Sequence, residues 1–231
     1  MSRLFESPAE EIARLVLVRH GRTQMNQEAR IGARDDSELD TIGLQQAHLA
    51  AERLTEFPAA HIYASPIRRA QQTAGIIAAK LNLAVETNSD LTEYHFGLIS
   101  GLTMNEIHEK YADIYADIQD WIYLRSDPNR DRPIIPEEES FYNLEARTDH
   151  FINMVVEKHQ GETVIAVTHL GVIKACIASL FGSTVHRPMN YIAFNTSVTV
   201  IDFLRKRPIL MSFNDTRHLD LDLSYGKITP F

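Results

Sequence analysis

Hydrophobic positions follow two patterns along this chain. In several short segments most residues are apolar, as in Leu15-Val16-Leu17-Val18, which is typical of a strand buried on both faces of a sheet. Between them lie longer segments in which apolar residues recur at spacings of three and four, the period of a helix with one buried face. The first pattern predicts strands at residues 15–18, 61–64, 84–87, 163–168 and 198–203, and the second predicts helices at 41–54, 66–80, 103–121, 140–158 and 170–181.

Side chains at the predicted helix starts can satisfy the free backbone N–H groups of a first turn. Thr41 and Ser140 precede two of the helical patterns, and Thr103 with Glu106 has the spacing of a capping box. Ser65 is followed by proline, which predicts an N-cap with proline at the first helical position. These signals predict where the helices begin.

Strands that alternate with helices indicate βαβ units and a mainly parallel sheet. We therefore expect an α/β fold, a three-layer sandwich with a mostly parallel central sheet flanked by helices. No linker divides the sequence, so we expect residues 1–231 to form a single domain, with residues 1–14 as a lead-in. Within the lead-in, Ser7 and Glu10 have the spacing of a capping box for one helical turn.

Two further segments complete the expected architecture. Residues 126–136 contain three prolines, which predicts a loop. This loop belongs to a cap insertion that we expect at about residues 98–140. The tail from Arg205 is expected to add one edge strand.

Composition and charge mainly exclude certain classes of protein and certain structural features. The formal net charge of −8 argues against a general binder of nucleic acid or of anionic membranes, since both use a basic surface. The single cysteine, Cys176, rules out internal disulfides, and its apolar neighbours indicate a buried structural thiol in a reducing compartment. The first residues resemble neither a signal peptide nor a transmembrane span, so we expect a cytoplasmic protein.

Polar residues concentrate at or just after the ends of four predicted strands. In open α/β sheets the crevice beyond the carboxyl ends of the strands is the usual ligand site. Arginines suit a phosphate, a neutral imidazole can attack phosphorus, and a carboxylate can protonate the leaving oxygen. The chain has no H-E-x-x-H motif, and we expect no metal or other cofactor. The residues concerned are Arg19 and His20 after the first strand, Arg68 and Arg69 after the second, Glu93 after the third and His169 after the fourth.

Short motifs surround these residues. Arg19-His20-Gly21-Arg22-Thr23 has the form R-H-G-x-T. The other motifs are Asn26, LDTIGLQQA at 39–47, SPIRRAQQTA at 65–74, LTEYHFG at 91–97, ES at 139–140 and VTHLG at 167–171. In order and near spacing, from residue 15 to about 203, they resemble the segments of the histidine phosphatase superfamily, in its phosphoglycerate-mutase-like branch.

This resemblance implies a role for each matching residue. His20 would be the nucleophile that becomes phosphohistidine, and Glu93 the general acid that protonates the leaving group and then the base that activates water. His169 would donate to the phosphoryl oxygens and stabilise charge in the transition state. Arg68 is expected to be an exposed helix residue. The resemblance implies phosphate contacts for Arg19, Arg69, Thr23 and Asn26, with Gly21 letting the turn bring backbone amides close to the anion.

Departures from the family pattern concern the substrate. Arg22 stands where the family usually has glutamate, so it either makes the entrance more cationic, as a substrate contact, or pairs with a local acid. Glu137-Glu138-Glu139 is interpreted as a solvated charge run. His95, close to Glu93, is the one further histidine considered for a contact with the site.

We predict a phosphohydrolase that acts on a small phosphorylated substrate through a phosphohistidine on His20, as a monomer or homodimer. A phosphoglycerate mutase is the alternative within the same chemistry. Residues 93–97 support it, since the mutases carry a similar motif, whereas Arg22 and the altered cap insertion argue against it. A non-catalytic phosphate-binding regulatory module is disfavoured, because the side chains needed for catalysis are all present. These are Arg19, His20, Arg69, Glu93 and His169.

Overall fold

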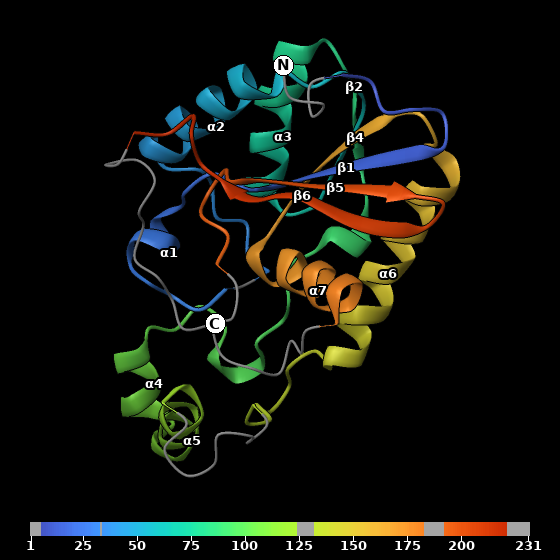
Figure 1. Ribbon diagram of the computed structural model, residues 1–231. Coiled ribbons are helices and arrows are strands. Elements are labelled where there is room, and N and C mark those ends of the chain that lie inside the picture. Colours follow the sequence, from blue (N-terminus) through green and yellow to red (C-terminus); the bar gives the residue numbers. More distant parts are fainter. Residues whose placement is uncertain (1–5, 33, 124–131, 183–191, 221–231) are drawn as a thin grey trace.

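A six-stranded sheet with helices on both faces forms the body of the protein (Figure 1). The computed structural model describes residues 6–32, 34–123, 132–182 and 192–220. Helices α2 and α3 cover one face of the sheet, and α6 and α7 cover the other (Figure 1). The expected three-layer α/β fold is therefore confirmed. Within these described ranges, no helix combines the length and the apolar character needed to cross a membrane.

The strands follow the order β3-β2-β4-β1-β5-β6 across the sheet. Strands β1 to β4 run parallel to one another, whereas β5 is antiparallel to β1 and β6 is antiparallel to β5. This confirms the mostly parallel sheet and the edge strand expected from Arg205. The strands are β1 Ile12–Arg19, β2 Ala59–Ala64, β3 Val85–Thr87, β4 Thr163–Thr168, β5 Val198–Leu204 and β6 Arg207–Asp215.

The five helices predicted from apolar periodicity are found, whereas the short elements α1, η2 and η3 and a break inside the segment 103–121 were not predicted. The segment 103–121 forms two helices, because the backbone leaves helical geometry at Tyr111, with φ −140° and ψ 61°. The helices are α1 Gln24–Gln27, α2 Thr41–Leu54, α3 Arg68–Leu81, α4 Met104–Lys110, α5 Ala112–Ile122, α6 Phe141–Lys158 and α7 Leu170–Phe181, with 3₁₀ turns η2 Ser89–Leu91 and η3 Gly97–Ile99.

Two of the predicted N-caps are wrong. Asp40 rather than Thr41 caps α2, because its carboxylate accepts from the amide of Gly43 at 2.7 Å. Helix α3 begins only at Arg68, after Ile67, so the hydroxyl of Ser65 is available to another partner. The N-cap Ser140 and the Thr103–Glu106 capping box are confirmed.

In the described part of the lead-in before β1, residues 6–11, the helical turn predicted at Ser7 and Glu10 is not found. This part contains a turn in which the amide of Ile12 donates to the carbonyl of Ala9 at 2.8 Å, and β1 begins directly after it. Strand β1 starts three residues before the apolar run and so includes the polar residue Arg14, which is buried in the sheet. Its guanidinium is neutralised by Asp202 on β5 at 2.7 Å, a partner that a local pattern cannot reveal.

The sheet separates two hydrophobic clusters, and this explains the continuous apolar runs. On β1, Leu15 and Leu17 face the cluster under α6 and α7, whereas Val16 and Val18 face the cluster under α2 and α3. Both faces of the strand are thus buried. Packing on both sides fixes the carboxyl end of β1, where the polar residues begin.

Helices α4 and α5 of the cap insertion lie away from the sheet (Figure 1). Ile107, Ile118 and Trp121 join the cluster under α6 and α7, so these helices are packed onto the body. Residues 1–5 of the lead-in and 124–131 of the cap insertion lie outside the described residues.

Candidate active site

Two histidines lie side by side at the carboxyl edge of the sheet. Strands β1 and β4 are parallel neighbours, with Arg19 opposite Thr168, so the next residue of each strand, His20 and His169, is brought to the same place. Their ring centroids are 5.0 Å apart. Both are buried, with exposed fractions of 2% and 0%.

The hydrogen bonds of His20 define its tautomer. Nδ1 lies 2.7 Å from the carbonyl oxygen of Gly21, which can only accept, so Nδ1 carries the proton. The Nε of Arg69 donates to Nε2 at 3.2 Å, so Nε2 holds the lone pair. Burial, followed by the charges of Arg69 and Arg19, lowers the pKa of His20 well below 6.5. The imidazole is therefore neutral at neutral pH, with a nucleophilic nitrogen.

His169 is held by the end of the neighbouring strand β2. Its Nε2 lies 2.8 Å from the hydroxyl of Ser65, while its buried Nδ1 has no hydrogen-bond partner in the described structure. Burial and the charge of Arg69 lower the pKa of His169 well below 6.5 as well. Ser65, which was predicted from the sequence to cap a helix, thus contacts the ring of His169 instead and orients it.

The arginines approach from β1 and from the first turn of α3. Burial lowers the pKa of Arg19 to about 10, although Glu93 opposes this shift. The Nη1 of Arg19 donates to the carbonyl of Ala193 at 2.7 Å, and its buried Nε has no hydrogen-bond partner among the described residues. Arg69 is buried and directs Nη1 to the hydroxyl of Ser37 at 3.2 Å. Arg68 is exposed and forms an ion pair with Glu38, which confirms the expectation that it is a surface residue.

Glu93 is a buried carboxylate in the segment after η2. Its Oε1 accepts from the amides of Tyr94 at 2.8 Å and Gly171 at 3.1 Å. A Cβ added to Gly171 would lie 2.5 Å from this oxygen, so only glycine allows α7 to approach the carboxylate so closely. The glycine of the VTHLG motif therefore serves the position of Glu93.

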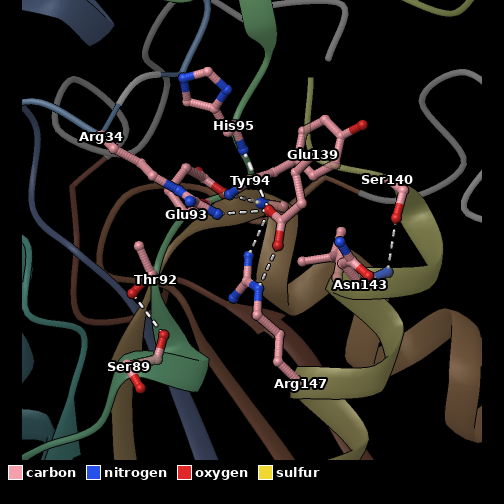
Figure 2. A network of polar contacts seen from close by, with 12 residues as sticks. Arg34, Ser89, Thr92, Glu93, Tyr94, His95, Glu139, Ser140, Asn143 and Arg147 are labelled. Atoms are coloured by element: carbon pink, nitrogen blue, oxygen red, sulfur yellow. Dashed lines mark hydrogen bonds and ion pairs between the residues drawn. The ribbon is translucent and has the colours of Figure 1, made fainter. Parts of the chain in front are cut away.

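An ionic network centred on Glu139 holds the segment that carries Glu93 in place (Figure 2). Glu139 accepts from Arg147 at 2.8 and 3.0 Å and from Arg34 at 2.7 Å. Arg34 also donates to the carbonyl of Glu93 at 2.7 Å, and Arg147 to that of Asp90 at 2.6 Å. Burial would raise the pKa of Glu139, but its bonds and ion pairs with the two arginines lower it below the usual range.

The interpretation of residues 137–139 as a solvated charge run is wrong for two of the three. Glu139 joins the network just described, and Glu138 forms an ion pair with Arg132 at 2.5 Å. The side chains of both carboxylates are largely buried, and only Glu137 is exposed. The run is therefore mostly structural.

The pocket beside His20 contains most, but not all, of the predicted binding residues. Thr23 and Asn26 line it and form the capping box of α1. Asn195, which the sequence did not suggest, donates to the carbonyl of His20 at 2.9 Å and so links β5 to this loop. The lining residues are Arg19, His20, Thr23, Met25, Asn26, Arg30, Ile31, Gly32, Ser37, Arg69, Glu93, Phe96, Leu170 and Gly171.

Gly21, Arg22, His95 and His169 do not line this pocket, although the ring of His169 lies beside that of His20. The amide of Gly21 donates to the hydroxyl of Thr73 at 3.0 Å, and a Cβ on Gly21 would lie 2.6 Å from a backbone oxygen of α2. Arg22 pairs with Asp40 at 2.8 Å, the second of the two roles considered for it. The ring of His95 is bonded to the carbonyl of Glu137 at 3.0 Å.

Comparisons with known proteins identify the family of the chain. Residues 15–216 match the model of the histidine phosphatase superfamily (branch 1). Phosphoglycerate mutase-like protein 4 of Arabidopsis thaliana is 38% identical over 174 residues, which cover 74% of this chain and 72% of the relative. A metal-independent phosphoserine phosphatase of the same plant is 34% identical over 213 residues, 90% of this chain and 84% of the relative.

A solved structure gives a similar result. The phosphoserine phosphatase of Entamoeba histolytica, in complex with 3-phosphoglyceric acid, matches with a TM-score of 0.74 and 26% sequence identity. The match covers 89% of this chain and 98% of that chain.

Proposed function

The chain belongs to branch 1 of the histidine phosphatase superfamily, and from this premise we propose that it transfers the phosphoryl group of a small phosphomonoester to His20 and then to water. The net reaction is the hydrolysis of a phosphoric monoester. The observation that carries the proposal is the lone pair on Nε2 of a neutral, buried His20 beside two arginines and the carboxylate Glu93.

Donors for the phosphate are available next to this nitrogen. Arg19 Nε and His169 Nδ1 are buried without partners in the described structure, and buried polar groups of this kind are normally satisfied, here by a ligand oxygen. If the hydroxyl of Ser65 donates to Nε2 of His169, the single proton of the neutral ring resides on Nδ1. His169 then donates to a phosphoryl oxygen without carrying a charge.

The two steps use the same groups in turn. Nε2 of His20 attacks phosphorus, the bond to the leaving oxygen breaks, and Glu93 in its acid form gives that oxygen a proton. Arg69, whose Nε now contacts Nε2, would donate to the phosphoryl group instead. In the second step Glu93 takes a proton from water, the water oxygen attacks phosphorus, and the P–N bond breaks. His20 and protonated Glu93 are regenerated.

The arginines that line the pocket indicate where the phosphate of the substrate would bind. Arg30 also lines the pocket, but it is paired with Glu28 and Glu106, each at 2.6 Å. The phosphate is expected at Arg19 and at Arg69, since the Nε of Arg69 already contacts Nε2 of His20 and its ion pair with Asp35 is longer, at 3.5 Å. The names of the relatives make phosphoserine and 3-phosphoglycerate the first esters to test.

A phosphoglycerate mutase is the second candidate, and the 38% identity to a protein named phosphoglycerate mutase-like supports it. A mutase returns the phosphoryl group from His20 to the product instead of to water. Isomerisation of 3-phosphoglycerate faster than release of inorganic phosphate would favour this alternative.

The test is to trap the phosphoenzyme. Wild-type protein is mixed with labelled substrates, quenched and assayed for acid-labile protein phosphate and for inorganic phosphate. We expect label in the wild type and none in His20→Ala. Glu93→Gln should accumulate label with p-nitrophenyl phosphate, because this leaving group needs no acid whereas the attack of water needs the base. Turnover without label, or label that persists in His20→Ala, would contradict the mechanism.

A further inference from the structure

A second cluster of ligating side chains lies at the opposite edge of the sheet. His61 lies in β2, His159 is the C-cap residue of α6, and Glu162 immediately precedes β4. His61 is paired with Val164 in the parallel register of β2 and β4, so the cluster lies at the amino ends of strands whose carboxyl ends point to the active site. Its potential ligand atoms, one from each side chain, all lie within 4.8 Å of one another.

We propose that His61, His159 and Glu162 bind a zinc ion, with water as the fourth ligand. Oε2 of Glu162 lies 3.2 Å from Nε2 of His61 and 2.9 Å from Nδ1 of His159. Ligands of a tetrahedral zinc, each about 2.0–2.2 Å from the metal, are separated by roughly 3.3–3.5 Å. A small opening of the cluster therefore admits the ion. Two imidazoles and one carboxylate are a set of ligands that zinc accepts.

In each imidazole ring, the outer nitrogen, which faces away from Glu162, lies near a group that can accept a hydrogen bond from it. Nε2 of His159 lies 3.1 Å from the hydroxyl of Tyr63, and Nδ1 of His61 lies 3.8 Å from a carboxylate oxygen of Glu86. Without an ion, Nδ1 of His159 can donate to the carboxylate of Glu162, which can only accept. On zinc binding the protons would reside on the outer nitrogens, and the lone pairs of both rings would point to the metal. Ligating histidines in metal sites are usually oriented by such a partner on the other nitrogen.

The electrostatics of this edge suit a cation. His159 ends an 18-residue helix, whose C-terminus carries the negative end of the helix dipole. Glu162 and Glu86 add carboxylates. The side chains of His61 and Glu162 are 34% and 41% exposed, which gives an ion an entry path, whereas that of His159 is only 7% exposed and is held in place.

Bound zinc would join the start of β2, the end of α6 and the start of β4. Strand β2 is distant from the other two along the chain, and an ion that binds only the folded protein would raise its thermal stability. The site lies away from His20, and zinc binding is measured directly, so its test does not depend on the phosphatase mechanism.

The experiment uses the full chain after treatment with a chelator. We expect calorimetry with zinc chloride to show one ion per chain and the melting temperature to rise with zinc. Addition of Co²⁺ should give the visible absorption of a tetrahedral site. His61→Ala and Glu162→Gln change partly exposed side chains, so both should fold, as circular dichroism can verify. Each should weaken zinc binding at least about 100-fold, since each removes a ligand.

The matched control is His150→Ala. His150 is an exposed histidine that pairs with a carboxylate of Asp90 at 2.6 Å, and the described residues place no third ligand there. This variant should keep the zinc affinity of the wild type. Absence of zinc binding by the wild type, or equal affinity in the wild type, His61→Ala and Glu162→Gln, would overturn the proposal and leave the cluster as a hydrogen-bonded network.

Discussion

The molecule holds two close pairs of histidines at opposite edges of one sheet. His20 and His169 follow the carboxyl ends of β1 and β4, with ring centroids 5.0 Å apart. His61 and His159 lie at the amino ends of β2 and β4, with centroids 4.3 Å apart. The first pair is surrounded by arginines and the second by carboxylates. The same side chain is thus prepared for an anion at one edge and for a cation at the other.

The difference shows that neighbours decide what a histidine can do. At the carboxyl edge, burial and two guanidinium groups keep His20 neutral, so its lone pair is available to attack phosphorus. At the amino edge, Glu162 faces both rings and would share a positive ion with them. Five changes test this contrast, from the largest expected effect to the smallest.

The most direct change removes one histidine from each pair. We expect His20→Ala to lower kcat by about 10³-fold or more, because no other group supplies the nucleophile. His61→Ala should keep the kcat of the wild type and lose only the binding of zinc. Assays of phosphate release on both variants check this. An equal loss of activity in the two would show that the edges do not act separately.

A second change tests how tightly the carboxyl edge is built. In Gly171→Ala the new Cβ would lie 2.5 Å from Oε1 of Glu93, so the carboxylate must move. We expect kcat to fall about 100-fold, the cost of a misplacement near 1 Å. Gly75→Ala is the control, since a Cβ there meets nothing within 4 Å. It should keep full activity and stabilise α3 by about 1 kcal/mol, measured by urea unfolding.

A third change removes the support behind Glu93. Arg34→Ala deletes the donor to the carbonyl of Glu93 and one partner of Glu139. We expect kcat to fall roughly tenfold with KM nearly unchanged. The loss should be smaller with p-nitrophenyl phosphate, whose leaving group needs no acid. Arg68→Ala removes an exposed arginine and should change neither constant. Similar losses in both variants would rule out a positioning role for Arg34.

A fourth test uses pH. His20 and His169 have folded pKa values well below 6.5, whereas in the unfolded chain they take up protons near 6.5. Their contribution to stability is therefore present above pH 6.5 and is lost as the pH falls below it. Each should add about 1.4 kcal/mol per pH unit to the slope of the unfolding free energy. His20→Gln should remove one such contribution between pH 6 and 5, and Gly75→Ala none. Equal slopes in all three proteins would contradict the burial of a neutral His20.

The smallest effect is expected for Arg22→Ala. Arg22 lies outside the pocket lining and is paired with Asp40. Loss of this partly exposed pair should reduce stability by less than about 1 kcal/mol and change kcat/KM by no more than about twofold. Steady-state kinetics with phosphoserine, 3-phosphoglycerate and p-nitrophenyl phosphate checks this. A rise in KM of tenfold or more would make Arg22 a substrate contact.

Much of the fold could be predicted because its causes are local. The runs at residues 15–18 and 163–168 are apolar on both faces, and the side chains of Ser140 and of Thr103 with Glu106 cap the helices next to them. The break at Tyr111 and the burial of Arg14 depend on tertiary contacts. No periodicity along the chain carries that information.

The site was predictable where short motifs carry it, and the structure places Arg19, Thr23, Asn26, Arg69 and Glu93 around His20. Two residues that support the site through tertiary hydrogen bonds were missed. Ser65 was assigned to a helix start, and Asn195 lies in the turn before the antiparallel strand β5. The cluster of His61, His159 and Glu162 was missed for the same reason, because His61 is far from the other two along the chain.

The position of β1 between β4 and β5 also has a consequence for synthesis of the protein. Strand β1, which ends next to His20, leaves the ribosome long before either of its neighbours, β4 and β5. At about 5–20 residues per second, the roughly 180 residues between His20 and Leu204 take on the order of 10–40 s. During that interval the nucleophile has neither His169 nor Asn195 beside it. The candidate site can therefore assemble only after β4 and β5 have been synthesised.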